Sequence, residues 1–411
     1  MYLDPHLPLA RSEDLPFSRH ATTPREAMAA HLPRQVQPFL TWLTARPAPG
    51  EAMPERSPKT FVGGALGWIA AGIVLTVLPF LAELAWPAWA LVPLGLLFTS
   101  CGLGLFQVVI FHHCSHGTVF STRPRNRQAG RLISSLLLFK RFDDYQREHM
   151  LHHSPNKLLT EEDEFADFVF GLCGLEAGLP KRELWRRVLA AVVSPAFHAR
   201  FLIRRVQKSL FTGDTAHDWP GRVFWASAIA LTLATGTFDL FLLAWVLPVT
   251  VLLQIATIGR IIVEHSFPEA DVIHARGREL VCHASTGVFP GSMPPAGHPV
   301  AVGGVMAWAG WWAEMLTWQL FVRLFVLVGD APCHDYHHRK PATKKWTSYI
   351  HARQQDLESG TGCLAGYSES WGLVRAMDRS LASLAATTPA TLRRQPTEAL
   401  VPPVDAAAVP A

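Results

Sequence analysis

Three short runs organise this chain: His112-His113-Cys114-Ser115-His116, His149-Met150-Leu151-His152-His153 and His334-Asp335-Tyr336-His337-His338. The first has the form HxxxH, and the other two have the form HxxHH. Residues three and four apart share one face of a helix, so each run is expected to point two or three imidazoles in one direction. Imidazole suits iron, zinc and copper. The expected metal ligands are His112, His116, His149, His152, His153, His334, His337 and His338.

Eight imidazoles are more than one metal ion uses. A catalytic zinc, for example, needs only about three protein ligands and an open position. The runs therefore predict a site for two metal ions. The alternative is that these residues are interfacial histidines at helix ends, but that alternative does not explain their spacing.

Two further histidines need separate treatment. His113 is adjacent to His112 and points about 100° away from it on a helix, so we interpret it as structural. His265 is a single histidine, but it ends an apolar segment on the same side as the three runs. We therefore predict that His265 is a ninth ligand.

Carboxylates close to the runs are candidate partners of the ligands, because metal-bound histidines usually donate their other N–H to a carboxylate or carbonyl. Glu148, Glu264 and Asp335 each neighbour a predicted ligand and are expected to serve a histidine of another run. The acidic stretch at residues 161–164 is expected to be a solvated loop. We identify no catalytic residue beyond the metal ligands and no organic cofactor site.

The composition indicates an integral membrane protein. The 411 residues are 49% hydrophobic and 17% charged, whereas about 25% charged is usual in soluble proteins. The formal net charge of +4 is explained by cytoplasmic loops, so no nucleic-acid partner is expected. The six cysteines form no CxxC pair, and we predict neither a disulfide framework nor a thiolate zinc site.

Long apolar stretches predict four membrane helices in two hairpins, because about 20 apolar residues cross a bilayer. Residues 61–84 and 90–110 form the first hairpin, and residues 223–263 form the second around a turn at 235–239. The basic stretch at residues 121–222 is assigned to the cytoplasm by the positive-inside rule. The predicted fold is therefore an all-α, multi-pass integral membrane protein. A cytoplasmic helical cap holds the histidine-rich site, and both termini lie on the cytoplasmic side.

We predict three regions along the chain. Residues 1–58 form a polar segment without a signal-peptide core, in which apolar residues between 32 and 43 recur at helical spacing. That helix lies either on the membrane surface or on the protein itself. Residues 59–345 form the membrane domain, and 346–411 contain a short helix near 371–384 and a disordered tail. Residues 300–328 are interpreted as an interfacial or buried helix, because Glu314 and Arg323 are costly in lipid.

The three runs resemble the histidine boxes of the membrane fatty acid desaturase and hydroxylase superfamily. The segments His152-His153-Ser154-Pro155-Asn156 and Glu162-Asp163-Glu164-Phe165 are also similar to the region of its second box. The resemblance covers about residues 60 to 345. It implies four membrane helices in two hairpins and a cytoplasmic di-iron centre. A histidine after the fourth helix is known in the superfamily, which supports His265.

The resemblance implies an O2-dependent desaturase that acts on a fatty acyl chain, with two iron ions and O2 as co-substrate. No His-Pro-Gly-Gly haem-binding motif is present, so electrons are expected from a separate redox protein of the ferredoxin, rubredoxin or cytochrome b5 type. One alternative is a hydroxylase or ketolase of a long apolar substrate such as a fatty acid, alkane or carotenoid. A non-enzymatic alternative is a membrane metal-binding protein.

Overall fold

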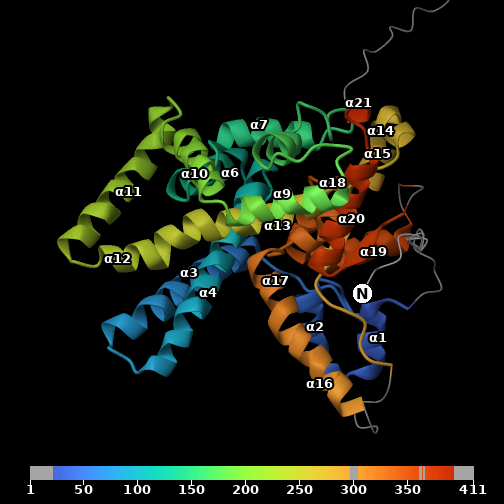
Figure 1. The fold of residues 1–411 in the computed structure, drawn as a ribbon, viewed down its shortest axis with the longest axis horizontal. Coiled ribbons are helices and arrows are strands. Elements are labelled where there is room, and N and C mark those ends of the chain that lie inside the picture. The colour runs from blue at the N-terminus through green and yellow to red at the C-terminus, as the bar shows by residue number, and fades with distance from the viewer. Residues whose placement is uncertain (1–21, 297–303, 361–362, 364–365, 393–411) are drawn as a thin grey trace, which may run out of the picture.

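The computed structural model describes residues 22–296, 304–360, 363 and 366–392, and nearly all of the regular secondary structure in them is helical. Two long helical hairpins project from a group of shorter helices (Figure 1). The predicted tail at residues 393–411 and the start of the polar N-terminal segment lie outside the described residues.

The first hairpin matches the predicted positions. Its first helix, α3, spans Pro58–Leu81, and a 3-10 turn at Trp86–Ala90 leads into α4, Leu91–Gly104. The helix continues through a π-helical segment, Leu105–Phe111, into α5, His112–Ser115. The first histidine run is thus a direct extension of an apolar helix. π-Helical segments are rare and often lie at functional sites.

Glycine allows the two helices of this hairpin to approach closely. A Cβ atom on Gly95 would lie 2.6 Å from the Gly72 carbonyl oxygen and 2.4 Å from the Thr76 hydroxyl. A Cβ atom on Gly72 would lie 2.4 Å from the backbone nitrogen of Thr99. Small residues at such contacts permit tight packing where lipid provides no hydrophobic driving force.

The second hairpin pairs α11, Thr215–Ala234, with a long helix that contains α12, Phe238–Phe241, and α13, Leu253–Glu264. Two π-helical segments, Leu242–Val246 and Pro248–Leu252, connect α12 to α13. Among the described residues, three helices have the length and apolar composition of a membrane span: Pro58–Leu81, Trp86–Ser115 and Phe238–Glu264. The other helix expected to span, α11, is the third of the four in chain order and is absent from this set; it opens with a polar turn, so its sequence is less clearly that of a span.

The basic part of the sequence forms helices around the histidine runs. These helices are α6 (Arg123–Leu136), α7 (Phe142–His152), α8 (Glu164–Ala166, followed by a π-helical turn at Asp167–Leu172), α9 (Lys181–Val193) and α10 (Pro195–Leu210). Arg205 on α10 is buried and donates hydrogen bonds of 2.7–2.9 Å to the carbonyls of Leu137, Leu138 and Val249. A buried arginine needs such acceptors, and here they join these helices to the second hairpin.

The N-terminal helices pack on the protein itself, which decides between the two predicted locations. Helix α1 spans Pro24–His31, and α2 spans Gln37–Thr44 after a 3-10 turn at Arg34–Val36. Their apolar side chains form one cluster with Trp308, Trp311 and Met315. Figure 1 shows α2 alongside α16 and α17.

The predicted helix between residues 300 and 328 consists of α16, Gly304–Glu314, a π-helical turn at Met315–Gln319, and α17, Leu320–Phe325. Residues 300–303 of that prediction lie outside the described residues. Both charged side chains have partners. The Glu314 carboxylate accepts from Ser292 and Gln319, and buried Arg323 donates to the Trp42 carbonyl and the Tyr349 hydroxyl.

The C-terminal part of the chain packs against the third histidine run, which lies on α18, His334–Arg339, after a 3-10 turn at Ala331–Cys333. The remaining elements are α14 (Ala270–Ala275), α15 (Gly277–Ala284), a 3-10 turn (Lys344–Ser348), α19 (Tyr349–Ser359), α20 (Leu373–Ala386) and α21 (Pro389–Leu392). Strands β1, Gly287–Phe289, and β2, Glu369–Trp371, pair in parallel, with Gly287 opposite Glu369.

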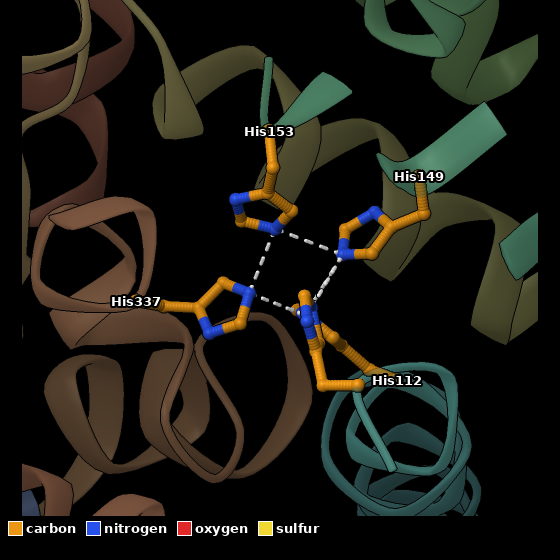
Figure 2. Close-up of side chains that lie close together, drawn as sticks. His112, His149, His153 and His337 are labelled. Carbon is orange, nitrogen blue, oxygen red and sulfur yellow. Dashed lines mark hydrogen bonds between the residues drawn. The ribbon is translucent and has the colours of Figure 1, made fainter. Parts of the chain in front are cut away.

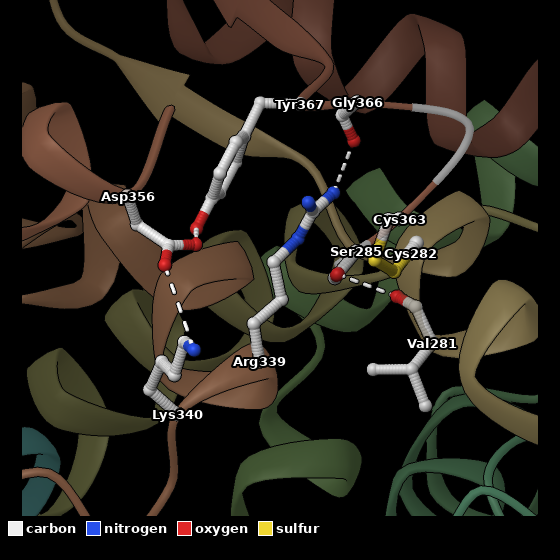
Figure 3. The surroundings of a disulfide bond; sticks show 9 residues. All are labelled: Val281, Cys282, Ser285, Arg339, Lys340, Asp356, Cys363, Gly366 and Tyr367. Carbon is white, nitrogen blue, oxygen red and sulfur yellow. Dashed lines mark hydrogen bonds and ion pairs between the residues drawn. A yellow bond between two sulfur atoms is a disulfide. The ribbon is translucent and has the colours of Figure 1, made fainter. Parts of the chain in front are cut away.

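The prediction that the cysteines form no disulfide is wrong. Cys282 on α15 and Cys363 are disulfide-bonded, although 81 residues separate them (Figure 3). Only the tertiary packing brings them together, so their spacing carries no signal. Near the disulfide, Arg339 donates to the Gly366 carbonyl, and Lys340 lies 3.6 Å from the Asp356 carboxylate. The first contact joins the segment after α19 to the end of α18, and the second joins the residue after α18 to α19.

We predict that Gly95→Leu destabilises the first hairpin, because the new side chain meets the backbone of α3. Overpacking of this kind costs about 1–3 kcal/mol, and we expect a lower unfolding temperature of the protein in detergent, measured by tryptophan fluorescence. Gly67→Leu is the matched control, because Gly67 lies on the same hairpin and a Cβ atom there would have no other atom within 4 Å. Equal unfolding temperatures for the two variants would contradict the close packing.

Candidate metal centre

The three histidine runs and His265 come together in two adjacent groups. Within each group, one nitrogen of every ring lies within 4.8 Å of the corresponding nitrogens of the others. The first group is His112, His116, His149, His153 and His337, and the second is His152, His265, His334 and His338. All nine histidines predicted as ligands belong to these groups.

Four members of the group of five, His112, His149, His153 and His337, have their ring nitrogens directed at one small volume (Figure 2). The Nε2 atom of His112 lies 2.7 Å from that of His337 and 3.1 Å from that of His149. His153 Nε2 lies 3.0 Å from His149 Nε2 and 2.9 Å from His337 Nε2. Because an Nε2 atom carries at most one proton, these nitrogens cannot all satisfy one another by hydrogen bonds. A shared cation is a better partner for this arrangement.

The group of four is completely buried. His265 Nε2 lies 3.1 Å from His152 Nε2, and His338 Nε2 lies 3.0 Å from His334 Nε2. The chain leaves α13 at Glu264, and His265 adopts an extended conformation that forms a backbone bridge with Ser285. This bridge directs a single histidine into a site otherwise made from helical runs.

Two carboxylates, the buried Asp163 and the partly exposed Glu164, hold the second run. His152 Nδ1 lies 2.7 Å from the Asp163 carboxylate, and His149 Nδ1 lies 3.1 Å from the Glu164 carboxylate. The expectation of a solvated loop at residues 161–164 is therefore wrong for these two residues, although Glu161 and Glu162 are exposed. The chain turns back after α7 and brings Asp163 and Glu164 to the histidines of that helix. No helical spacing in the sequence connects these carboxylates with their histidines.

The other expected carboxylate partners are only partly in place. Glu264 lies 4.0 Å from His334 Nδ1. Glu148 is paired with Lys140, and Asp335 is paired with Arg353 at 2.6 Å, so neither serves a histidine as predicted. Glu148 precedes His149 and Asp335 follows His334 by one position, so both side chains face away from the histidine groups. Each pairs with a basic side chain instead.

The Arg353–Asp335 pair fixes the helix of the third run. Both side chains are fully buried, and Arg353 also donates 2.8 Å to Glu369 on β2. Removing one partner of such a pair costs about 3–5 kcal/mol, because the other charge stays buried. Sequence reasoning missed Arg353, since no motif connects it with the histidine run.

His113 lies outside both groups. Its Nε2 is 2.6 Å from the Asp330 carboxylate, and its ring stacks on Trp346 at 4.4 Å. This is a structural position, in agreement with the interpretation of the helical offset.

The environment controls the charge of the histidines. Burial, with the neighbouring histidines His113 and His152, lowers the pKa of His116 to about 3. Burial and His152 also lower the pKa of His265 to about 3. Burial alone would lower the pKa of His152, but the Asp163 carboxylate raises it to about 9. Neutral imidazole is the form that binds a metal, so a metal ion must displace the Nε2 proton of His152, while Asp163 keeps the Nδ1–H in place.

The donor set fits two metal ions. Each group has enough convergent imidazoles for one ion, and no carboxylate or thiol belongs to either. Imidazole is compatible with iron, zinc, copper and nickel. Asp163 and Glu164 instead accept from the outer ring nitrogens of His152 and His149, as is usual around metal-bound histidines.

Fold and site together define a helical membrane protein with two adjacent histidine groups for metal binding. The sequence matches the family model described as fatty acid desaturase over residues 87–341, more than half of the chain, including all three histidine runs and His265. The chain therefore belongs to the fatty acid desaturase family, whose activity is an oxidoreduction of the desaturase or hydroxylase kind. No curated protein matches the chain.

We predict that His265→Ala lowers the amount of metal bound per protein, because the group of four loses a buried donor. The measurement is elemental analysis of the purified protein by mass spectrometry. His283→Ala is the control, since His283 is exposed and belongs to neither group. Unchanged metal content in His265→Ala would remove His265 from the ligand set.

Proposed function

We propose that the protein is an O2-dependent di-iron membrane oxidoreductase that introduces a double bond into a lipid acyl chain. Its metal ligands are the nine histidines of the two groups. This proposal rests on one observation above all, which is an apolar cavity that touches both groups.

The cavity has a volume of about 240 Å³. His112 and His149 from the group of five and His152 and His334 from the group of four line it. The apolar part of its wall includes Val108, Phe111, Phe139, Phe165, Phe168 and Ile261. The wall also contains charged residues, namely Lys140, Arg204, Arg205, Lys208, Arg260, Glu164, Asp167 and Glu264. Its apolar part supports a hydrocarbon chain placed against both metal positions, since small-molecule sites combine apolar walls with convergent polar groups.

A pair of iron ions, when bound by these histidines, supplies the redox chemistry that couples O2 reduction to the removal of hydrogen from unactivated carbon. In the balanced reaction, two adjacent methylenes lose two hydrogens and a donor supplies two electrons. Solvent supplies two protons, and O2 becomes two molecules of water.

The side chains of the protein hold this reaction in place. The aromatic rings on the cavity wall position the acyl chain by apolar contact and exclude water, which strengthens electrostatic interactions inside the site. Asp163 and Glu164 accept the Nδ1–H groups of His152 and His149 and fix the orientation of both rings. Tyr145 stacks on His149 at 5.0 Å and restricts the ring from its other face.

The proposal includes a multi-pass membrane topology with four spans. Helix α11 completes the second hairpin, and its exposed Trp219, Leu231 and Leu233 suit contact with lipid. The basic helices α6 to α10 support a cytoplasmic position of the histidine groups by the positive-inside rule. Electrons then come from a separate cytoplasmic redox protein.

Expression in a bacterial host, followed by mass spectrometry of its lipids, tests the reaction. We expect acyl chains lighter by two hydrogens with the wild type and none with His337→Ala, which loses a donor of the group of five. His283→Ala is the control and is expected to behave like the wild type. Products that gain an oxygen atom instead would select hydroxylation or ketone formation over desaturation.

Ile261→Phe tests the cavity separately from the metals. The larger side chain fills space that the acyl chain needs, so we expect at least about a tenfold loss of activity, the factor that about 1.4 kcal/mol represents. Bound iron is expected to stay at the wild-type level. Ile229→Phe, at an exposed position on α11, is the control. Full activity of Ile261→Phe would show that the acyl chain lies elsewhere.

A further inference from the structure

The Cys282–Cys363 disulfide joins two segments of the chain that each support part of the group of four. Cys282 lies on α15, and Cys363 lies between α19 and β2, with the two Cα atoms 6.3 Å apart (Figure 3). Neither cysteine belongs to the two histidine groups. Oxidation of a substrate at the histidines does not use this covalent bond, so its effect must come from what it holds together.

The first segment, the end of α15, supports His265. The Ala284 carbonyl accepts a hydrogen bond of 2.8 Å from the backbone nitrogen of Ser266. The next residue, Ser285, forms the backbone bridge that directs His265 into the group of four. Both contacts lie directly after Cys282 in the chain. A displacement of α15 at Cys282 therefore moves the backbone that holds His265.

The second segment, which contains Cys363, is attached to the end of α18. The Gly366 backbone nitrogen donates a hydrogen bond of 3.2 Å to the Cys363 carbonyl. The Gly366 carbonyl accepts from Arg339, the last residue of α18, whose guanidinium also lies 3.7 Å from the centre of the Tyr367 ring. Arg339 directly follows His338, a member of the group of four. Cys363 is thus connected through Gly366 to the helix of the third histidine run.

The two joined segments support most of the group of four. His265 is held by the end of α15, and His334 and His338 lie on α18, whereas the fourth member, His152, lies on α7. In the group of five, His337 lies on α18, and the other members belong to the first and second histidine runs. A covalent link between the segments therefore restricts the group of four much more than the group of five.

A thiol from solvent can reach one side of the disulfide. Cys363 is partly exposed, whereas Cys282 is buried. The four other cysteines, Cys101, Cys114, Cys173 and Cys333, are free and buried. Thiol–disulfide exchange begins when a thiolate attacks an accessible sulfur of a disulfide. Exchange is therefore expected at Cys363 and not at the other cysteines.

We propose that the Cys282–Cys363 pair is a redox switch that controls how firmly the group of four retains its metal ion. The disulfide fixes the segments that support His265 and His338, and reduction lets these segments move apart. The inference rests on the proposed function for the cytoplasmic position of the pair, where disulfides are usually transient, catalytic or redox-sensing. It adds a means by which the redox state of cellular thiols would regulate the oxidation.

The reductant is a small thiol of the glutathione class, which supplies two electrons in two steps. Its thiolate attacks the Cys363 sulfur, the S–S bond breaks, and Cys282 leaves as a thiolate that takes up a proton. A second thiolate of the same reductant then attacks the mixed disulfide, and Cys363 leaves and takes up a proton. Two molecules of the reductant are thereby oxidised to one disulfide, and the protein gains two thiols.

Release of Zn²⁺ from the full chain in neutral detergent tests the switch. Zinc suits imidazole ligands and has no redox chemistry of its own, so the protein is loaded with it and release to a chromogenic chelator is followed before and after reduction with tris(carboxyethyl)phosphine. We expect reduction to expose two further thiols, counted by alkylation and mass spectrometry. About one zinc ion per protein should then leave at least about tenfold faster, because the covalent restraint is lost. Reoxidation with oxidised glutathione should restore the slow rate.

Two variants separate the switch from a general effect of the phosphine. Cys282→Ser/Cys363→Ser should release zinc at the fast rate with or without the phosphine. Cys173→Ser is the control, because Cys173 is buried, free and outside both segments, and it should behave like the wild type. Several results would overturn the switch: no further thiols in the reduced wild type, the same release rate before and after reduction, or equal acceleration by the phosphine in the double variant. The wild-type comparison stands even where the double variant does not fold.

The switch and the proposed function can fail independently. Zinc release that depends on the phosphine, from a protein that leaves host lipids unchanged, supports the switch and contradicts the desaturase activity. Desaturated host lipids together with zinc release that is independent of the phosphine do the opposite.

Discussion

The convergence of nine imidazoles is the constraint on which the rest of this structure depends. His112 and His337 are 225 residues apart in the sequence, yet their Nε2 atoms lie 2.7 Å apart. Such a cluster is unfavourable without a cation, because desolvated nitrogen lone pairs face one another. The surrounding scaffold must therefore hold each run rigidly, and much of the fold can be understood as that support.

The support consists largely of buried charges with specific partners. Arg353 anchors the third run through Asp335, Arg205 joins the helices of the second run to the second hairpin, and Asp163 orients His152. Each of these groups would be costly to bury alone. Because each has its partner only in the native packing, these pairs favour one arrangement of the helices over alternatives.

The site is also divided into two environments. One cavity contacts both histidine groups and has phenylalanine side chains on its wall, while a second cavity contacts only the partly exposed His116 and His153 of one group. No residue lines both cavities, so they reach the histidine groups through separate parts of the protein.

The sequence by itself determined the helical membrane class, the first hairpin and the nine histidines that meet, because helical spacing and apolar length are local properties of the chain. His265 was identified from its place after an apolar helix, and His113 was set apart by its helical offset. Tertiary structure alone decided which histidines share a group, because each group mixes residues from different runs. It also decided the partners of the carboxylates, the position of Arg353 and the Cys282–Cys363 disulfide. These contacts join residues that are distant in sequence and follow no periodicity, so they exist only once the helices have packed.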